Sequence, residues 1–235
     1  MKKIIVFSAL LLTSSSIFSQ IEASEIGAEF HEVATYPEGG VQTYGSGKVV
    51  GSPYFYPNWT SGSVTTIRNK VITKDCLFIY DKITQQLYLK RKDSAIMEAD
   101  RDQISAFTLN TDRVHYFVAG GKYDPSKKDD FFEVLVNNDK GYTLLKLIKT
   151  KFVKADFTDL LKVGDGDIYD KYQDDISYYI SYKSSVPKKI LLKEKDIKKI
   201  LPMEKDKITA YFNQNRNANG IDATFLTGLV QSLNE

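Results

Sequence analysis

Cysteine, histidine and tryptophan are scarce in this chain of 235 residues, which contains one Cys, two His and one Trp. With Cys76 alone, an intramolecular disulfide is impossible and a metal site built from several thiolates is excluded. A catalytic thiolate would need a base beside it, and only His31 and His115 could supply an imidazole. Because Cys76 begins the strand-like run Cys-Leu-Phe-Ile-Tyr, we expect it to be a small buried residue.

The chain also lacks the usual motifs of several enzyme classes. It contains no HExxH, GxSxG, P-loop or GxGxxG pattern, which removes the ordinary signals of zinc proteases, α/β-hydrolases and nucleotide-dependent enzymes. His115 stands in the strand-like run Arg113–Val118, where we expect a partly exposed histidine. No local motif therefore indicates catalysis, and a hydrolase site would have to be built from carboxylates that only the fold brings together.

Long apolar runs are missing except near the first residue. Two lysines precede Ile4–Leu12, which is apolar apart from Ser8. This run is too short to cross a bilayer core of about 30 Å, and its flanks are typical of a cleaved signal peptide. We expect residues 1–19 to be that signal peptide, cut after Ser19, with Ala23 as the alternative. The remaining chain is then periplasmic or secreted and has no integral membrane span.

A strong net charge is absent as well. Lys and Arg number 32 against 30 Asp and Glu, and removal of the two lysines in 1–19 leaves 30 of each. A neutral chain gives no electrostatic support for nucleic-acid binding. Charge is instead separated along the sequence, because 154–175 contains seven aspartates whereas 183–207 contains nine lysines against four acidic residues.

Aromatic residues are plentiful, with 15 Tyr and 13 Phe, and this favours β-structure. The runs Phe131–Val136 and Tyr142–Val153 flank a turn of residues that tolerate left-handed backbone angles, which predicts a β-hairpin. The second run also fits helical spacing, but the turn before it and its composition favour a strand. Further strands are predicted at Ser63–Ile67, Cys76–Asp81, Gln86–Arg91, Ala95–Ala99, Ile104–Leu109, Val114–Ala119, Ser177–Lys183 and Lys188–Leu192.

The apolar spacing changes to a helical period after Leu192. A short helix is expected to begin at Asp196 and to end at Pro202, a second stops near Asn215, and Asp222 is a suitable N-cap for a third. The fold class predicted is α+β, an antiparallel β-meander, rolled or sandwiched, with a C-terminal subdomain of short helices. The expected divisions are the signal peptide 1–19, a partly disordered N-terminal arm 20–50, a β domain 51–192 and a helical subdomain 193–235 packed on the sheet.

Three short motifs give the chain a resemblance to other exported proteins. They are Gly51-Ser-Pro-Tyr54, a strand of the Gly-x-Val type that starts at Gly62, and Leu87-Tyr-Leu-Lys-Arg91. Over most of residues 49–234, the chain resembles an uncharacterised family of exported proteins from diderm bacteria. Members of that family run from a signal peptide through a β-meander to a helical C-terminus. The family has no established activity, so the resemblance implies export and fold but no chemistry.

Two groups of residues are candidates for ligand contact. The aromatic residues Tyr54, Tyr56 and Trp59 could form a platform for a glycan or a peptide, or they could simply plug the open end of the sheet.

The second group is acidic. Asp165, Asp167 and Asp170 could supply oxygen ligands to a calcium ion, although their spacing departs from the EF-hand pattern. The alternative is a solvated acidic turn that binds nothing.

These patterns favour an exported, non-catalytic protein that binds another protein or an envelope component, and no cofactor is indicated. The alternatives are a periplasmic or secreted hydrolase with an Asp/Glu-based site, and a purely structural envelope protein. Converging carboxylates in a cleft, or one carboxylate with His115, would favour the hydrolase. An exposed aromatic or apolar patch would favour the binding protein.

Overall fold

The computed structural model describes residues 30–32, 49–73, 75–92, 95–155, 169–215 and 220–235. The expected signal peptide at 1–19 lies outside these residues, and so does most of the expected arm at 20–50. Asp165 and Asp167 lie outside them too. The predictions made for those segments stay predictions.

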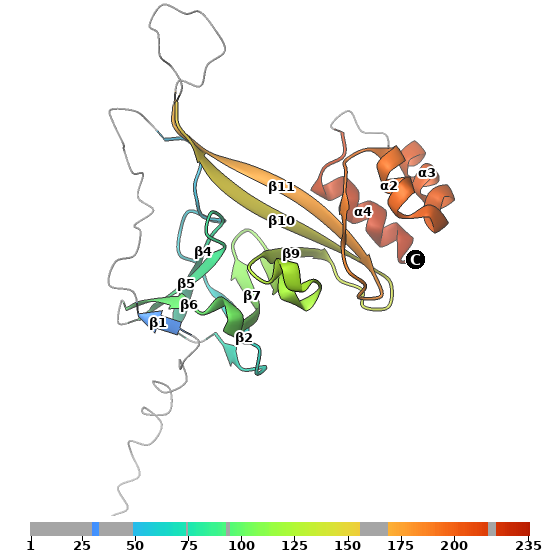
Figure 1. The fold of residues 1–235 in the computed structure, drawn as a ribbon. Helices are drawn as coiled ribbons and strands as arrows, with labels where there is room; N and C mark the ends of the chain where they lie inside the picture. Colours follow the sequence, from blue (N-terminus) through green and yellow to red (C-terminus); the bar gives the residue numbers. More distant parts are fainter. Residues whose placement is uncertain (1–29, 33–48, 74, 93–94, 156–168, 216–219) are drawn as a thin grey trace, which may run out of the picture.

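Two antiparallel sheets contain the described strands (Figure 1). The four-stranded sheet has the order β1 (Phe30–Glu32), β6 (Ile96–Ala99), β5 (Gln86–Arg91), β4 (Cys76–Asp81). The eight-stranded sheet has the order β12 (Lys188–Ile190), β11 (Lys171–Tyr182), β10 (Tyr142–Val153), β9 (Phe131–Val136), β8 (Val114–Ala119), β7 (Ile104–Asn110), β2 (Gly62–Thr66), β3 (Val71–Ile72). Strands β7 to β12 are neighbours in chain order, which is the predicted meander. The predicted α+β class is thereby confirmed.

The two sheets pack together through an aromatic cluster. Tyr80 of β4 lies 5.2 Å from Phe107 of β7 and 5.4 Å from Phe117 of β8, measured between ring centroids. Phe107 and Phe117 stack at 4.6 Å, and Phe131 of β9 meets Tyr80 and Phe107 edge-on. All four rings are buried, and Cys76 is buried in the same cluster, as expected. Such ring pairs add to the free energy gained from burial alone, so this cluster is the centre of the sandwich.

A turn between β4 and β5 ties the smaller sheet to β10. The Gln85 amide donates to the carbonyl oxygens of Lys82 and Ile148, both at 2.9 Å. Its Oε1 accepts from the Tyr80 hydroxyl at 2.7 Å and from the Phe131 amide at 3.3 Å. One buried side chain thus bridges three strands and two sheets.

The longest elements are β10 and β11, which pair along their whole length. The predicted bounds of β10 are confirmed, but β11 begins at Lys171 and not at the predicted Ser177. Residues 173–176 are exposed on both faces, so the apolar alternation that marks a strand is missing there. Asp174 and Asp175, which the predicted strand left out, therefore lie on a strand.

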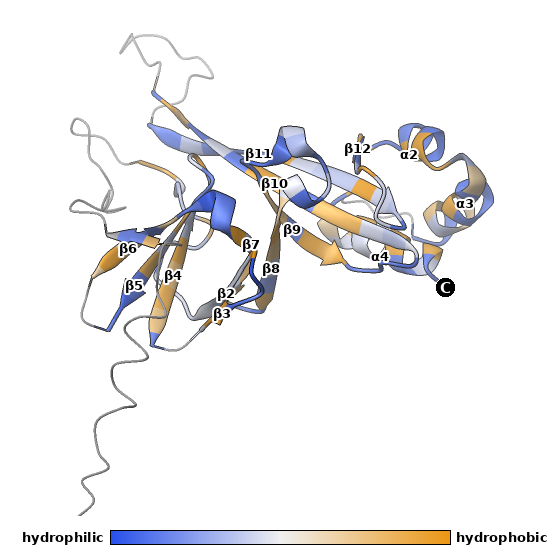
Figure 2. Ribbon diagram, turned by 60° about the horizontal axis from the view of Figure 1, so that its bottom comes forward, coloured by the Kyte–Doolittle hydropathy of each residue, from blue (hydrophilic) through white to orange (hydrophobic). Residues whose placement is uncertain are grey.

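Three helices cover one face of these two strands at the end where Tyr142 pairs with Tyr182 (Figure 1). They are α2 (Glu194–Ile200), α3 (Lys205–Gln214) and α4 (Ala223–Leu233). Hydrophobic segments of α4 and of the neighbouring β9 stand out in Figure 2. The Asp222 carboxylate accepts from the Phe225 amide at 2.8 Å, which confirms the predicted N-cap. No helix in the described ranges is long and apolar enough to cross a membrane.

Candidate functional site

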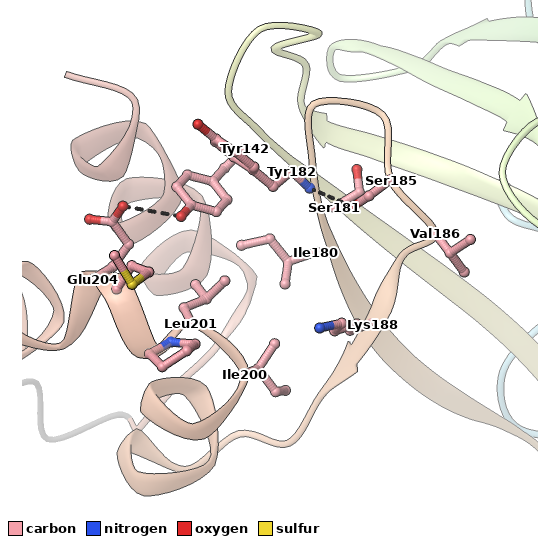
Figure 3. Close-up of a pocket in the computed structure, with 12 residues that line it drawn as sticks. Tyr142, Ile180, Ser181, Tyr182, Ser185, Val186, Lys188, Ile200, Leu201 and Glu204 are labelled. Atoms are coloured by element: carbon pink, nitrogen blue, oxygen red, sulfur yellow. Dashed lines mark hydrogen bonds between the residues drawn. The ribbon is translucent and has the colours of Figure 1, made fainter.

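A groove of about 410 Å³ opens where the helices meet the end of β10 and β11 (Figure 3). Strands β10 and β11 supply one side, the segment from 185 to 188 a second, and the end of α2 with the short 3-10 turn η4 (Pro202–Glu204) a third. The lining residues are mostly apolar: Tyr142, Ile180, Ser181, Tyr182, Ser185, Val186, Lys188, Ile200, Leu201, Pro202, Met203 and Glu204.

Local structure decides which side chains reach the groove. Tyr142 pairs with Tyr182, and successive side chains of a strand point to opposite faces, so Tyr142 and Ile180 both lie on the helix-covered face. On the other side of the groove, Pro202 cannot continue α2, because it lacks an amide hydrogen and clashes with the preceding turn. The chain bends there into η4, and Met203 projects at the edge of the groove.

The interior and the rim of the groove are both apolar. Ile180 and Leu201 are buried, whereas Val186 and Met203 at the rim are 60% and 90% exposed. Isolated exposed apolar residues are common, but these two stand beside an apolar hollow that a partner could fill. The unbranched thioether of a methionine also adapts to many partner shapes.

One carboxylate lines the groove, and it accepts a hydrogen bond from a tyrosine. The Tyr142 hydroxyl donates to Glu204 Oε1 at 3.1 Å. Burial, followed by this hydrogen bond, raises the pKa of Tyr142 to about 12, so the phenol is neutral and remains a donor at ordinary pH. Among the lining residues, Glu204 is the only acid, and the set includes no histidine or cysteine. The groove therefore offers a binding surface and lacks an acid–base pair.

The surroundings of the groove are rich in lysine. Lys188 is part of the lining, and Lys183 places its ammonium 5.0 Å from the centre of the Tyr182 ring. The segment 183–207 carries nine lysines and four acids. Of those acids, Glu194 is already paired with Lys198 at 2.5 Å. The groove thus lies in a basic part of a nearly neutral molecule.

A buried histidine cluster lies apart from the groove. His115 Nδ1 is 2.6 Å from Glu133 Oε1, and His115 Nε2 is 3.2 Å from Asp112 Oδ1. Lys146 Nζ approaches Glu133 Oε2 at 3.1 Å, and the Phe55 ring meets the imidazole edge-on. At 8% exposure, His115 is not the partly exposed residue that was expected. The prediction was wrong because alternation puts His115 on the same face as Phe117, and this is the face of β8 that packs in the core. Strand β9, paired with β8, brings the Glu133 carboxylate to the ring on that face.

Both nitrogens of His115 are engaged in this cluster. Each of the two ring nitrogens lies within hydrogen-bond distance of a carboxylate oxygen. The Thr111 hydroxyl and His115 lower the pKa of Asp112 to about 2, so this carboxylate stays ionised. A ring that is held on both sides by carboxylates has no nitrogen left to take a proton from a substrate. The geometry suits a structural ion cluster.

Two of the three aromatic residues proposed as a platform, Tyr54 and Trp59, pack on the outer face of the smaller sheet. Tyr54 is 4% exposed and is buried with Ile79 and Tyr88, and the partly buried Trp59 packs against the same cluster. Only Tyr56 has an exposed ring. These three residues are not part of the groove, and a ligand role for them stays a prediction.

The acidic group proposed for calcium is only partly described. Asp165 and Asp167 lie outside the described residues, whereas Asp170 accepts from the Ala155 amide at 2.7 Å. Within the described ranges, no group of three or more His, Cys, Asp or Glu residues is arranged to hold a metal ion. A calcium role for these aspartates stays a prediction.

The rim of the groove was missed in the sequence. Val186 stands alone in the polar turn Ser184-Ser-Val-Pro187, and Met203 follows Pro202. A lone apolar residue in a turn is a weak signal, and no local pattern relates Val186 to Met203.

No protein-family model, no curated protein and no solved structure matches this chain.

Proposed function

We propose that this protein is an exported, non-catalytic binding protein that holds a protein or envelope component in the groove between β11, β12 and η4. The observation that carries the proposal is a preformed hollow of about 410 Å³ with a buried apolar interior and an exposed apolar rim. Ligand sites in proteins have this size and character, with few polar groups among mostly apolar ones.

The energetics of the rim support binding. Burial of apolar surface yields roughly 25 cal/mol per Å², so covering Met203 and Val186 would stabilise a complex. Both side chains are exposed in the folded chain, so neither yet contributes the free energy of burial. A purely structural envelope protein would have no need for such an open hollow.

The hydrolase alternative receives less support. Its test was a cleft with converging carboxylates, or with one carboxylate and His115. Glu204 is the only carboxylate among the lining residues, and it already accepts a hydrogen bond from Tyr142. Both ring nitrogens of His115 are already in contact with carboxylates. Binding is therefore the function that the geometry favours.

Export rests on the sequence. The signal-peptide pattern of residues 1–19 supports a location in the periplasm or outside the cell. The resemblance to exported proteins of diderm bacteria points the same way, and the envelope is then the source of the partner.

Site-specific crosslinking in cells tests this proposal. A photoreactive residue at Met203 should give adducts after export, whereas the same residue at Val114, which is 66% exposed on β8, should give only background. Adding Val186→Asp should remove the Met203 adducts, because a carboxylate at the rim disfavours apolar contact. Equal labelling at both positions, adducts that survive Val186→Asp, or turnover of a cell-wall substrate would overturn it.

A further inference from the structure

The groove has a chemical character that narrows its occupant. We propose that it binds an acidic polypeptide segment that inserts one bulky apolar side chain and lays its carboxylates over Lys183 and Lys188. This inference rests on the proposed function of the groove and adds the class of partner.

Charge complementarity is the first argument. Lys188 lines the groove from the short edge strand β12, and the Lys183 ammonium lies over the ring of Tyr182, another lining residue. Both lysines are exposed. Within the described part of the chain, neither ammonium has an ion-pair partner. Unpaired cations beside an apolar hollow attract an anionic partner and orient it.

The apolar surface continues beyond the groove. Leu191 and Leu192 directly follow β12 and are both exposed, as are Val186 and Met203. Exposed lysines among exposed apolar residues fit a segment that alternates acidic and apolar side chains. A single small anion would use only the lysines.

Glu204 favours a polypeptide over an anionic lipid as the ligand of the groove. Its Oε1 accepts from Tyr142, and its Oε2 has no hydrogen-bond partner in the described part of the chain. A peptide amide can donate to that oxygen, because each non-proline residue carries one N–H. A lipid phosphate or a fatty carboxylate entering the groove would be repelled by it, and an acyl chain cannot hydrogen-bond to it.

The shape of the groove agrees with this choice. Its rim residues are largely exposed, so an acyl chain in the groove would keep one side in water. A polypeptide covers the rim with its own backbone and neighbouring side chains. A flat anionic membrane would touch the lysines and Met203 but would leave the hollow unfilled.

Selection from a random twelve-residue peptide display library tests the inference on the chain lacking residues 1–19. Recovered peptides should be net acidic with a bulky apolar residue near the middle. The double variant Lys183→Glu/Lys188→Glu should weaken a recovered peptide by roughly tenfold and shift new selections toward basic peptides. The matched charge change Lys122→Glu/Lys128→Glu, placed on exposed lysines between β8 and β9, should have no effect.

The outcomes separate the two proposals. Recovery of neutral or basic peptides, recovery of no peptide, or binding that is unaffected by the Lys183 and Lys188 changes would overturn the acidic-peptide inference. Lysine-dependent binding to phosphatidylglycerol vesicles in place of peptides would also overturn it, in favour of a membrane surface. In each case, crosslinked adducts at Met203 that depend on Val186 would still support the proposed binding function. Absence of these adducts would overturn both the binding function and the acidic-peptide inference.

Discussion

Asn234 completes the hydrogen bonding of β10 at Tyr142. Its Oδ1 accepts from the Tyr142 amide at 2.7 Å, and its Nδ2 donates to the Tyr142 carbonyl at 2.9 Å. Strand β9 pairs with β10 only from Leu144 onward, so this side-chain amide stands where a neighbouring strand would supply its backbone. The residue after α4 thereby fastens the helices to the strand that lines the groove.

We expect Asn234→Ala to lower the free energy of unfolding by about 2 kcal/mol. Two hydrogen bonds are lost, and the partly buried N–H and C=O of Tyr142 lose their partner. Asn215→Ala is the matched control, because the Asn215 amide donates to the Tyr211 carbonyl at an exposed helix end. That change should cost less than about 0.5 kcal/mol in urea unfolding. An equal loss of unfolding free energy in both variants would show that the hydrogen bonds of Asn234 to Tyr142 add no particular stability.

Replacement of Gln85 should be among the most damaging single changes in the chain. Gln85→Ala removes four hydrogen bonds and leaves the buried Phe131 amide and Ile148 carbonyl unpaired, which predicts a loss of about 3 kcal/mol or more. Its backbone φ is 57°, so any cost of alanine at a left-handed backbone angle must be separated from the loss of contacts.

Asn69→Ala provides that separation. Asn69 has a φ of 61° and is exposed, so its replacement measures the backbone cost alone. We expect about 1 kcal/mol for Asn69→Ala in the same unfolding experiment. A Gln85→Ala cost no larger than this would refute the bridging role of the amide.

Acid should weaken the fold partly through Asp112. The folded state lowers its pKa from 3.8 to about 2, chiefly through the Thr111 hydroxyl and then through His115. A lowered pKa means that the ionised carboxylate favours the fold; this contribution is complete above about pH 4 and is lost as the pH falls toward 2. Between pH 5 and pH 2, Asp112→Asn should therefore lose less stability than the original chain.

Thr111→Val is the companion variant for that experiment. It removes the hydroxyl that contacts Asp112 Oδ1 at 2.6 Å and should reduce the acid sensitivity in the same direction. Denaturant midpoints at several pH values supply the measurement. Parallel pH profiles for all three proteins would mean that Asp112 is not linked to folding.

Ser181→Ala should stabilise the protein. The Ser181 hydroxyl is buried and has no hydrogen-bond partner in the described part of the chain. Removal of an unsatisfied buried polar group is expected to raise the free energy of unfolding by about 1 kcal/mol. Ser105→Ala should act in the opposite direction, because that hydroxyl donates to the Thr65 and Thr66 carbonyls at 3.0 Å. A destabilised Ser181→Ala would indicate a partner that the fold conceals.

Strands with one apolar face were predictable because the alternation of side chains is a local property. The bounds predicted for β4, β5, β8, β9 and β10 agree with the structure. Strand β11 was only half predicted, because its polar half has no buried face to mark it. The N-cap at Asp222 and the stop at Pro202 were readable for the same local reason.

The candidate site could not be predicted from local sequence. Tyr142 and Glu204 are 62 residues apart in the chain, and Val186 and Met203 come together only because β12 and the helices return to the end of β10 and β11. The seven aspartates of 154–175 and the lysines of 183–207 were adjacent as sequence segments. In the structure, Asp174 and Asp175 lie toward one end of β11, whereas the helices and Lys188 lie at the other.

Composition and periodicity alone determined the α+β class, the meander, the three short helices and the burial of Cys76. These features follow from the side-chain period of each element and from the solubility of each side chain, which are properties of neighbouring residues. Only the tertiary structure decided the burial of His115 between Asp112 and Glu133, the hydrogen bonds of Gln85 and Asn234, and the groove. Each of these depends on residues that are distant in sequence, and strand pairing and helix packing alone bring them within contact.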